Sequence, residues 1–419
     1  MIQVRKKAVT GASALTLAAL FAAPTPGFAA GAKCGEIVLG AALSFTGIYS
    51  TEGHNNKAGY DFGVKKLEDA GGLKIGGKCY NFRIKYYDDE STPARAAQLV
   101  ERLISQDSIQ YILGPYGSGT TTAVAPVAEK HHIPMLNASA ASRALYNKGY
   151  KYFFGTISTS EQYLSPIIDL AAEVAKKHGK KSSDVKVAIA VQDDPFSRDA
   201  RAGVVAEAKK YGMKIVIDDK LPRDLSDMSA TLTKVKALKP DVLIISGHEK
   251  GAVTAAREIG QKRIEVPMIG ISNCETAKFT ENFPKATEGV LCPTQWAESL
   301  PYKGELFGSA SHYNKEIKAA YPNTYKSELP YQVAEGSAAI AVYRDAFKRA
   351  GSLDKDKVRD ALAATDLMTF FGPIKFAPDG HNVAKPMVLR QIQNGKYVAV
   401  APTKYATGKL VWPRKAAGD

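Results

Sequence analysis

The sequence has only four cysteines and two tryptophans, and after residue 30 it has no run of eighteen apolar residues. A helix needs about twenty predominantly apolar residues to cross a bilayer, so the later segments are not expected to span a membrane. Hydrophobic residues make up 45% and charged residues 23% of the 419 positions, as in an ordinary globular protein. The length then predicts two or three water-soluble domains.

The first thirty residues have the composition of an export signal. Basic residues at 5–7 precede an apolar stretch at 8–23, and small residues at 27 and 29 provide a cleavage site. The apolar stretch is too short for a membrane anchor. Lys33 precedes Cys34, where a lipoprotein signal would need a small residue. We therefore expect residues 1–30 to be a signal peptide and the remainder to be periplasmic.

Acidic residues are outnumbered by basic ones, so the chain has a net charge of +14, or +11 without the basic residues at 5–7. An excess of this size can indicate nucleic-acid binding. The lysines are scattered, however, and pairs such as Lys176 with Lys177 and Lys234 with Lys236 have helical spacing. We interpret the charge as solvated helix faces and expect no nucleic-acid partner.

The cysteines, Cys34, Cys79, Cys274 and Cys292, all follow the export signal, in a compartment that permits disulfides. Four cysteines allow three pairings. Cys34 and Cys79 each lie just before a predicted strand, and Cys274 and Cys292 flank one short helix and its return. These positions favour the pairs 34–79 and 274–292. A zinc site is less favoured, because no two cysteines have the short spacing of zinc ligands.

Short apolar segments alternate with segments of helical periodicity from residue 36 onward. Strands are predicted at 36–42, 80–88, 111–113 and 133–137, with helices at 54–70, 93–106 and up to 131. The order restarts with strands at 185–191, 214–218, 242–246 and 267–271 and helices at 197–211, 228–238 and 251–260. Each set predicts a parallel sheet with helices on both faces.

The pattern changes after residue 300. Helices are predicted at 302–320, 329–350 and 356–364, followed by strands at 374–376, 387–393 and 397–401. We expect this part to complete the first two α/β units, not to form a third domain.

The stretch GPYGSGTTTAVAP, residues 114–126, follows the predicted strand at 111–113. No lysine follows Gly119 within the turn, which excludes a P-loop. Three threonines follow Gly119, and the stretch comes after the third predicted strand, which excludes a dinucleotide-binding turn. Ser118 and the N–H groups of the next helix could hold a carboxylate. Alternatively, Ser118 could cap that helix.

A second loop of small and hydroxyl residues, 137–142, follows the next predicted strand. Ligands of open parallel sheets bind at the carboxyl ends of the strands. The two loops together therefore predict one polar wall of a binding pocket.

Catalytic interpretations have little support. The sequence has neither a G-x-S-x-G elbow nor an H-E-x-x-H zinc motif. His248 and Glu249 follow a predicted strand, where lining a pocket is the favoured role. Asp193 and Asp194 are expected to cap a helix or line a pocket, since no further acid follows at calcium-loop spacing. We expect no enzyme activity, no cofactor and no metal.

Five stretches occur in an order that resembles the type I periplasmic solute-binding proteins of branched-chain amino acid ABC transporters, the Leu/Ile/Val-binding family. They are GEIVLGAALSFTGIYSTEG, AGYDFGVKKLEDAGG, KYYDDESTPARAAQLVERLI, YILGPYGSGTTTAVAPVAEKHHIPMLNASA and FFGPIKFAPDGHNV. The resemblance covers essentially the whole chain after the signal.

The resemblance implies two doubly wound parallel-sheet α/β lobes joined by three crossover strands, near 154–156, 292–294 and 371–376. Lobe 1 would comprise residues 31–154 and 294–371, and lobe 2 residues 155–293 and 372–419. The protein would be a monomer that closes over a small-molecule solute by a hinge and delivers it to a membrane permease. A ligand sensor for a separate signalling partner is the alternative.

The resemblance also implies which residues hold the ligand. Ser118, with Gly117 beside it, and the backbone N–H groups of Ser139, Ala140 and Ala141 match the positions that hold a ligand carboxylate in the family.

The positions that hold an ammonium group in the family depart from its pattern. They are occupied here by Ala141 and Ser272, and His248 replaces a tyrosine. We therefore expect carboxylates without an α-amino group, aromatic ones among them, to bind better than leucine or valine, with an amide or urea as the alternative. Tyr49, Phe196 and Trp296 are candidate apolar walls, and core packing is the alternative for each.

Overall fold

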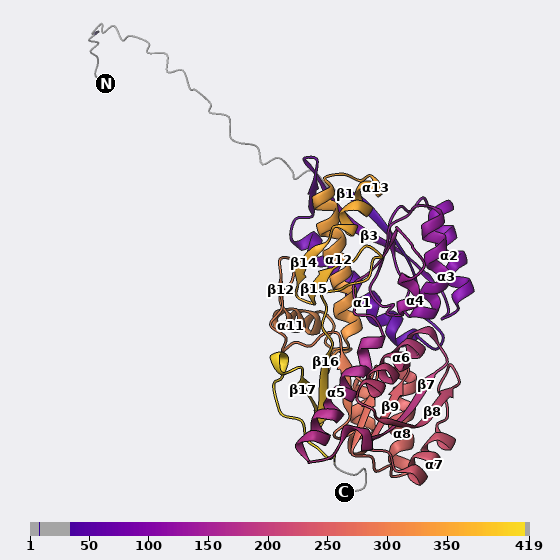
Figure 1. The fold of residues 1–419 in the computed structure, drawn as a ribbon. Coiled ribbons are helices and arrows are strands. Elements are labelled where there is room, and N and C mark those ends of the chain that lie inside the picture. The colour runs from indigo at the N-terminus through magenta and orange to yellow at the C-terminus, as the bar shows by residue number, and fades with distance from the viewer. Residues whose placement is uncertain (1–7, 9–33, 415–419) are drawn as a thin grey trace, which may run out of the picture. The chain divides into compact units, whose positions relative to one another are not determined.

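The structure is a computed structural model that describes residues 34–414 and, before them, residue 8 alone. The predicted signal peptide at 1–30 therefore lies outside the described residues, apart from that one position. Two large sheets, two small hairpins and the helices around them make up residues 34–414 (Figure 1). No helix in this described part is long and apolar enough to span a bilayer.

The first sheet has six strands in the order β2-β3-β1-β4-β5-β6. All neighbours are parallel except β2 and β3. The strands are β1 (Gly35–Leu43), β2 (Leu73–Ile75), β3 (Lys78–Asp88), β4 (Ile112–Leu113), β5 (Met135–Asn137) and β6 (Phe153–Gly155). The helices of this half are α1 (Ser50–Asp69), α2 (Pro93–Ser105), α3 (Ser118–Lys130) and α4 (Arg143–Tyr146).

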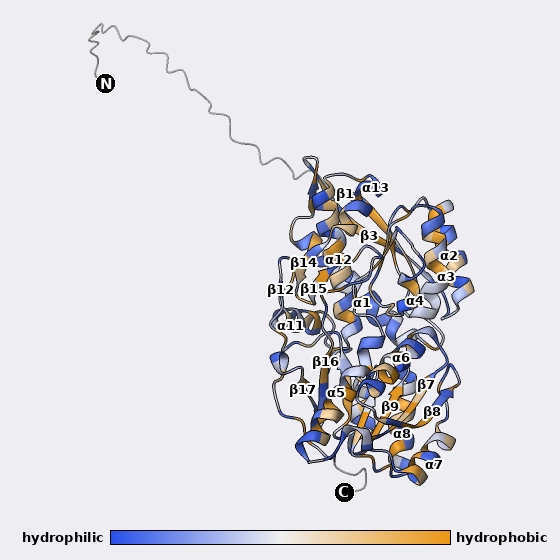
Figure 2. Cartoon of the chain, viewed as in Figure 1, coloured by the Kyte–Doolittle hydropathy of each residue, from blue (hydrophilic) through white to orange (hydrophobic). Residues whose placement is uncertain are grey.

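The second sheet has seven strands in the order β17-β16-β11-β10-β9-β7-β8. Its strands are β7 (Lys186–Gln192), β8 (Lys214–Leu221), β9 (Val242–Ser246), β10 (Met268–Ile271), β11 (Leu291–Thr294), β16 (Val388–Gln393) and β17 (Lys396–Ala401). Its helices are α5 (Glu161–Lys177), α6 (Pro195–Lys210), α7 (Ser229–Leu238), α8 (Glu249–Gln261), α9 (Ala277–Asn282) and α10 (Pro284–Thr287). Figure 2 shows the central strands β7 and β9 in the orange of apolar residues, as expected for parallel strands covered on both faces.

The C-terminal third returns to both sheets, as predicted. Two strands, β16 and β17, extend the second sheet with antiparallel pairing. Among its helices, α11 (Ala310–Ala320), α12 (Tyr331–Ala350) and α13 (Lys355–Ala363), α12 packs along α1. We call the first sheet with α1, α2, α3, α12 and α13 the first lobe, and the second sheet with α5–α8 the second lobe.

Both predicted disulfides are confirmed: Cys34 is bonded to Cys79, and Cys274 to Cys292. The first joins neighbouring parallel strands, since β1 pairs with β3 so that Gly35 lies opposite Tyr80. The second ties the loop after β10 to β11, which is its neighbour in the sheet.

The structure differs from the sequence-based prediction at residues 302–309. In place of a long helix at 302–320, the chain forms the hairpin β12 (Lys303–Gly304) and β13 (Gly308–Ser309) before α11 begins. Gly308 has a φ of 66°, which L side chains rarely adopt and which suits a tight turn. Ser309 then caps α11 by accepting a hydrogen bond from the N–H of His312 at 3.1 Å.

The third connection between the lobes, expected as a crossover strand near residues 371–376, also differs from the sequence-based prediction. Residues 372–375 form β15 (Gly372–Lys375), which pairs with β14 (Asp366–Thr369) and not with either large sheet. Thr369 closes the turn between them by donating its hydroxyl to the Gly372 carbonyl at 2.8 Å. The chain reaches β16 only after residues 376–387. Helix α5 and strand β2 have no counterpart in the predicted pattern.

Helices α1 and α12 pack closely because glycine lies at their contact. A Cβ atom on Gly59 would lie 2.1 Å from the carbonyl oxygen of Val333. The absence of a side chain there brings Asn56 of α1 within 3.2 Å of Glu335 of α12. This contact places the carboxyl group of Glu335 at the pocket described next.

Candidate functional site

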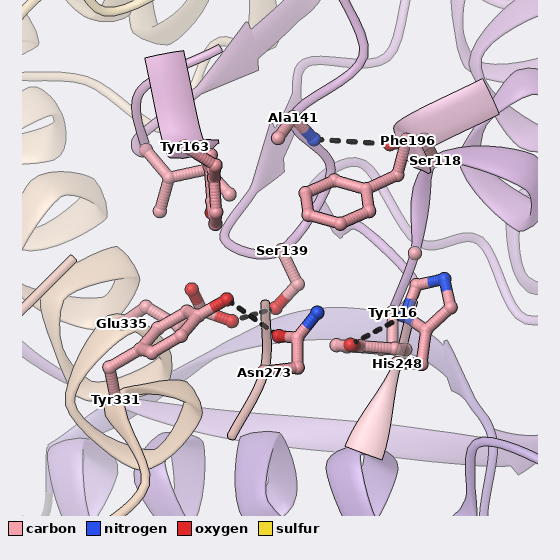
Figure 3. A pocket seen from close by; sticks show the side chains of 12 residues that line it. Tyr116, Ser118, Ser139, Ala141, Tyr163, Phe196, His248, Asn273, Tyr331 and Glu335 are labelled. Atoms are coloured by element: carbon pink, nitrogen blue, oxygen red, sulfur yellow. Dashed lines mark hydrogen bonds between the residues drawn. The ribbon is translucent and has the colours of Figure 1, made fainter. Parts of the chain in front are cut away.

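A small pocket lies between the two lobes, at the carboxyl ends of their strands (Figure 3). The first lobe contributes Tyr116, Gly117, Ser118, Ser139, Ala141, Tyr331 and Glu335 to its lining. The second lobe and the segment leading into it contribute Ile157, Tyr163, Phe196, His248 and Asn273. Six residues singled out in the sequence therefore meet here: Gly117, Ser118, Ser139, Ala141, Phe196 and His248.

Ser118 lies at the start of α3 but does not cap it. The cap position is Gly117, whose φ of 81° turns the chain into the helix, and Ser118 is the first helical residue. Its Oγ accepts hydrogen bonds from the N–H groups of Ala141 at 3.2 Å and Ser142 at 3.0 Å. Both lone-pair directions of that oxygen are thereby used, so its own proton remains to be donated.

The loop after β5 differs in detail from the prediction that its N–H groups hold a ligand. The side-chain oxygen of Asn137 accepts hydrogen bonds from the N–H of Ser139, at 2.8 Å, and from the N–H of Ala140. The N–H of Ala141 donates to Oγ of Ser118. These N–H groups are satisfied within the protein. The loop thus orients Ser118 and leaves ligand binding to the Ser118 hydroxyl and to the first turn of α3, whose N–H groups have no partner within the helix.

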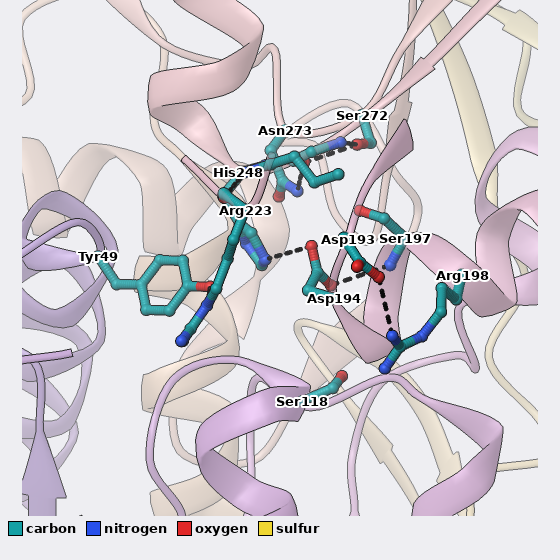
Figure 4. A network of polar contacts seen from close by, with 12 residues as sticks. Tyr49, Ser118, Asp193, Asp194, Ser197, Arg198, Arg223, His248, Ser272 and Asn273 are labelled. Carbon is teal, nitrogen blue, oxygen red and sulfur yellow. Dashed lines mark hydrogen bonds and ion pairs between the residues drawn. The ribbon is translucent and has the colours of Figure 1, made fainter. Parts of the chain in front are cut away.

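His248 lies at the centre of a buried polar and aromatic cluster (Figure 4). Its Nδ1 is 3.0 Å from the hydroxyl of Tyr116, and its Nε2 is 3.6 Å from Oδ2 of Asp194. Burial opposes protonation of His248, but the negative charge of the adjacent Asp194 prevails and raises the pKa of the imidazole. Burial likewise opposes ionisation of Asp194, but His248 lowers the pKa of that carboxyl group. Both shifts favour opposite charges on His248 and Asp194 behind the pocket wall.

Asp194 also has the helix-capping role considered from the sequence. Its carboxylate accepts the N–H of Ser197 at 3.0 Å and so caps α6. This cap fixes the position of Phe196, whose ring packs edge-on against Tyr163 at a centroid distance of 5.0 Å and forms part of the pocket wall.

Glu335 is a site residue that the sequence analysis missed. It is fully buried on α12, and its Oε1 accepts a hydrogen bond from the side-chain amide of Asn56 and contacts the hydroxyl of Ser139. Its Oε2 is buried without a hydrogen-bond partner in the described structure. Burial raises the pKa of Glu335 to about 8, against the opposing hydrogen bonds from Ser139 and Asn56 and the charge of Lys385. A lone acid among the apolar and small residues 333–343 was the available sequence signal.

Asn273 joins the lobes at the pocket rim. Its backbone has a φ of 52°, a conformation that asparagine tolerates better than most residues. Its Oδ1 accepts hydrogen bonds from the Tyr331 hydroxyl at 3.0 Å and the Gln332 amide at 3.3 Å, both from α12. Its own amide donates to the carbonyl of Gly247 at 2.7 Å. Asn273 therefore connects α12 to the loops after β9 and β10.

Four residues proposed from the sequence lie outside the pocket lining. Ala140 packs its side chain into the core of the first lobe, and Ser272 uses its hydroxyl to bond both backbone groups of Gly247. Trp296 belongs to the core, where its indole donates to the carbonyl of Phe370 at 3.1 Å. Tyr49 packs on the outer side of His248, with ring centroids 4.7 Å apart, and its hydroxyl contacts Arg223 at 3.4 Å.

Within residues 34–414, no three histidine, cysteine or acidic side chains are grouped closely enough to hold a metal ion. The lining of this pocket includes the hydroxyl donor of Ser118, the unpartnered carboxyl oxygen of Glu335 and several aromatic side chains. Such an arrangement can bind a small polar organic molecule by hydrogen bonding.

Comparisons with known proteins agree with this architecture. The family model described as periplasmic binding protein matches residues 36–396. A Leu/Ile/Val-binding protein homologue of Brucella suis is 23% identical over 411 residues, which cover 96% of this chain and 98% of that protein.

Two solved structures share the fold. One is the substrate-binding protein of a branched-chain amino acid transporter from Streptococcus pneumoniae, in complex with isoleucine (TM-score 0.71, 21% identity, 91% of this chain and 100% of that chain). The other is a solute-binding protein of an ABC transporter from Rhodopseudomonas palustris, in complex with benzoate (TM-score 0.75, 19% identity, 92% and 98%). With the family match spanning both lobes and the pocket between them, the chain belongs to the periplasmic binding protein family.

Proposed function

We propose that this protein is the solute receptor of an ABC importer, that it binds a small carboxylate-bearing solute between its lobes, and that it delivers the solute to a membrane permease. The solute is an amino acid or an aromatic or other organic acid. The protein acts in the periplasm as a monomer and does not transform its ligand. The signal peptide at 1–30 and the lobe limits given by the resemblance are part of this proposal.

The observation that carries the proposal is the Ser118 hydroxyl at the pocket. Its oxygen is occupied by two N–H groups, so its proton is directed to an acceptor that the loop itself does not provide. A ligand carboxylate is such an acceptor, and a hydrogen bond to a charged group contributes about 1.5–3 kcal/mol. Nearby N–H groups at the start of α3 add the favourable potential of a helix N-terminus.

The pocket is closed, which supports binding by movement of the lobes. Its free volume of about 10 Å³ has room for roughly one water molecule. Contacts between the lobes surround it: Tyr116 with His248, Glu52 with the N–H of Glu249, and Tyr331 with Asn273. A solute can enter only when these contacts separate, as in hinge closure around a ligand.

The related structures support the choice of solute class. A relative with this fold holds isoleucine and another holds benzoate, and both ligands carry a carboxylate. The aromatic side chains of Tyr163, Phe196 and Tyr331 at the pocket suit the apolar part of either ligand.

Titration calorimetry of the purified mature protein with isoleucine, benzoate, 4-hydroxybenzoate, succinate, acetamide and urea tests the proposal. We expect saturable binding of one molecule per chain for at least one carboxylate, and recovery of that ligand unchanged. Binding of the uncharged amides alone would contradict the carboxylate assignment and favour the amide alternative. If the protein binds the ligand but uptake of that ligand by cells does not depend on a permease, the sensor alternative would be favoured.

A further inference from the structure

The buried carboxyl group of Glu335 is a second polar site in the pocket, beside Ser139 and separate from Ser118 (Figure 3). Nothing in the proposed carboxylate site uses it. A buried polar atom without a partner is costly, and native proteins retain few of them. The question is what the free oxygen of this group can bind.

The hydrogen bonds around Oε1 define the chemistry of Oε2. The Ser139 hydroxyl lies 2.9 Å from Oδ1 of Asn56 and also contacts Oε1 of Glu335, but it has only one proton. Asn56 is held with its amide nitrogen toward Gln332, because that nitrogen donates to the Gln332 carbonyl at 3.0 Å. Its Oδ1 therefore faces Ser139 as an acceptor.

A proton on Oε1 satisfies the whole arrangement. Glu335 then donates to Ser139, and Ser139 donates to Asn56. Burial favours this neutral form by raising the pKa of Glu335 to about 8, against an opposing contribution from Lys385. Oε2 is then a carbonyl oxygen, and if Glu335 ionises it is a carboxylate oxygen. In both states Oε2 accepts hydrogen bonds and does not donate them.

We propose that Oε2 of Glu335 accepts a hydrogen bond from an N–H or O–H group of the solute, so that the ligand is a carboxylate with a second, donor-bearing group. This assignment rests on the proposed function, in which Ser118 holds the carboxylate. A neutral hydroxyl suits the neutral form of Glu335, whereas an ammonium group requires Glu335 to ionise and release its proton.

Two ligand pairs that differ only in the donor test the assignment by calorimetry at pH 7. They are 4-hydroxybenzoate against benzoate, and isoleucine against 3-methylpentanoate. In the wild type, we expect the donor-bearing member of at least one pair to bind ten times more tightly or better. In Glu335→Leu, we expect that ratio to fall below three. Asp345→Asn is the control, because Asp345 is a half-buried acid on the same helix, where it pairs with Arg349. This variant should leave the affinity ratio unchanged.

Glu335→Gln distinguishes a hydroxyl donor from an ammonium donor on the solute. It also provides a second test if the leucine variant does not fold. Glutamine can donate from Nε2 to Ser139 and present its carbonyl to the pocket, so a hydroxyl preference should survive. It cannot supply a negative charge, so an ammonium preference should fall tenfold or more. Titrations in buffers of different ionisation enthalpy should detect a proton released with isoleucine but none with 4-hydroxybenzoate.

The outcomes separate this assignment from the function on which it rests. Equal affinities within both wild-type pairs would overturn the role of Glu335 while leaving the receptor function intact. The same holds for a donor preference that persists in a folded Glu335→Leu variant. Absence of binding by all four ligands would overturn the carboxylate function and this assignment with it.

Discussion

At the scale of single residues, Ser118 and Glu335 divide the recognition of the solute between them. Ser118 is a donor whose oxygen is already occupied, and Glu335 has an acceptor oxygen without a partner. The two groups have opposite hydrogen-bonding roles. A solute that satisfies both must carry an acceptor and a donor, which restricts both its identity and its orientation.

Replacing Ser118 by alanine should weaken the binding of a carboxylate ligand by roughly 1.5–3 kcal/mol, because the charged acceptor loses its hydrogen bond. Calorimetric titration with the tightest ligand of the wild type measures the change. Thr233→Ala is the matched control, since Thr233 is an exposed hydroxyl residue on helix α7 and lies outside the pocket lining. Equal affinities of the wild type and the Ser118 variant would show that this hydroxyl only organises the loop.

Glu335 should also make the stability of the ligand-free protein depend on pH. Its pKa is raised from 4.5 to about 8 in the folded state, so the native protein retains a proton that the unfolded chain loses. This contribution to stability is fully present below about pH 4.5 and is lost as the pH rises to about 8, by up to about 1.4 kcal/mol per pH unit.

Urea unfolding at several pH values between 5 and 9 measures this dependence. Glu335→Gln should reduce the slope between pH 5 and 8, whereas Asp345→Asn should not. An unchanged slope in Glu335→Gln would assign the pH dependence to other buried acids, such as Glu249 and Glu275, whose pKa values burial raises to about 7.

At the scale of elements, the contact between α1 and α12 determines where Glu335 lies. Gly59→Ala would place a methyl group 2.1 Å from the Val333 carbonyl, so the helices would have to separate. We expect the free energy of unfolding to fall by about 1–3 kcal/mol, as for other overpacked cores, and ligand affinity to fall with it.

Urea unfolding and calorimetry on the same samples test this prediction. Gly119→Ala is the matched control for the unfolding measurement alone, since its Cβ would meet only Pro195 at 3.7 Å but Gly119 belongs to the first turn of α3 at the pocket. A Gly59→Ala variant as stable as Gly119→Ala would show that the two helices have room to move apart.

The regular elements were predictable because each one carries its own local pattern. The strand at Val242–Ser246 was predicted with its observed limits, and most other β-α units were found within a few residues. The failures occur where one or two residues override the local period. Gly308 turns the chain at φ 66° inside a segment with helical periodicity, and the Thr369–Gly372 turn pairs β15 with β14.

The pocket was predictable only where it follows strands. Ser118, Ser139 and His248 lie after strands, and the sequence indicated all three. Glu335 and Tyr331 enter from α12, which lies much further along the chain, and no local pattern shows which sheet that helix reaches. For Trp296 the sequence left the pocket wall and the core open, because a large aromatic residue fits either, and the structure places it in the core.

At the scale of the whole molecule, ligand binding should close the lobes and stabilise the fold. A solute at 100 times its dissociation constant should raise the free energy of unfolding by about 2.7 kcal/mol, because it binds only the folded form. Small-angle X-ray scattering should show a smaller radius of gyration with the tightest carboxylate than without it. A thermal shift without any change in scattering would indicate that the free protein is already closed in solution.

The sheet order has a consequence for how the protein is made. Strand β11 acquires its outer neighbour β16 only when residues 388–393 have emerged, and α1 acquires α12 only after residue 331. Neither lobe can therefore finish folding while only the N-terminal part of the chain has been synthesised. Until the last tenth of the sequence arrives, β11 is an unpaired sheet edge, which is a site for aggregation. Nascent chains that stall before residue 388 should need a holding chaperone, whereas chains that reach residue 401 should not.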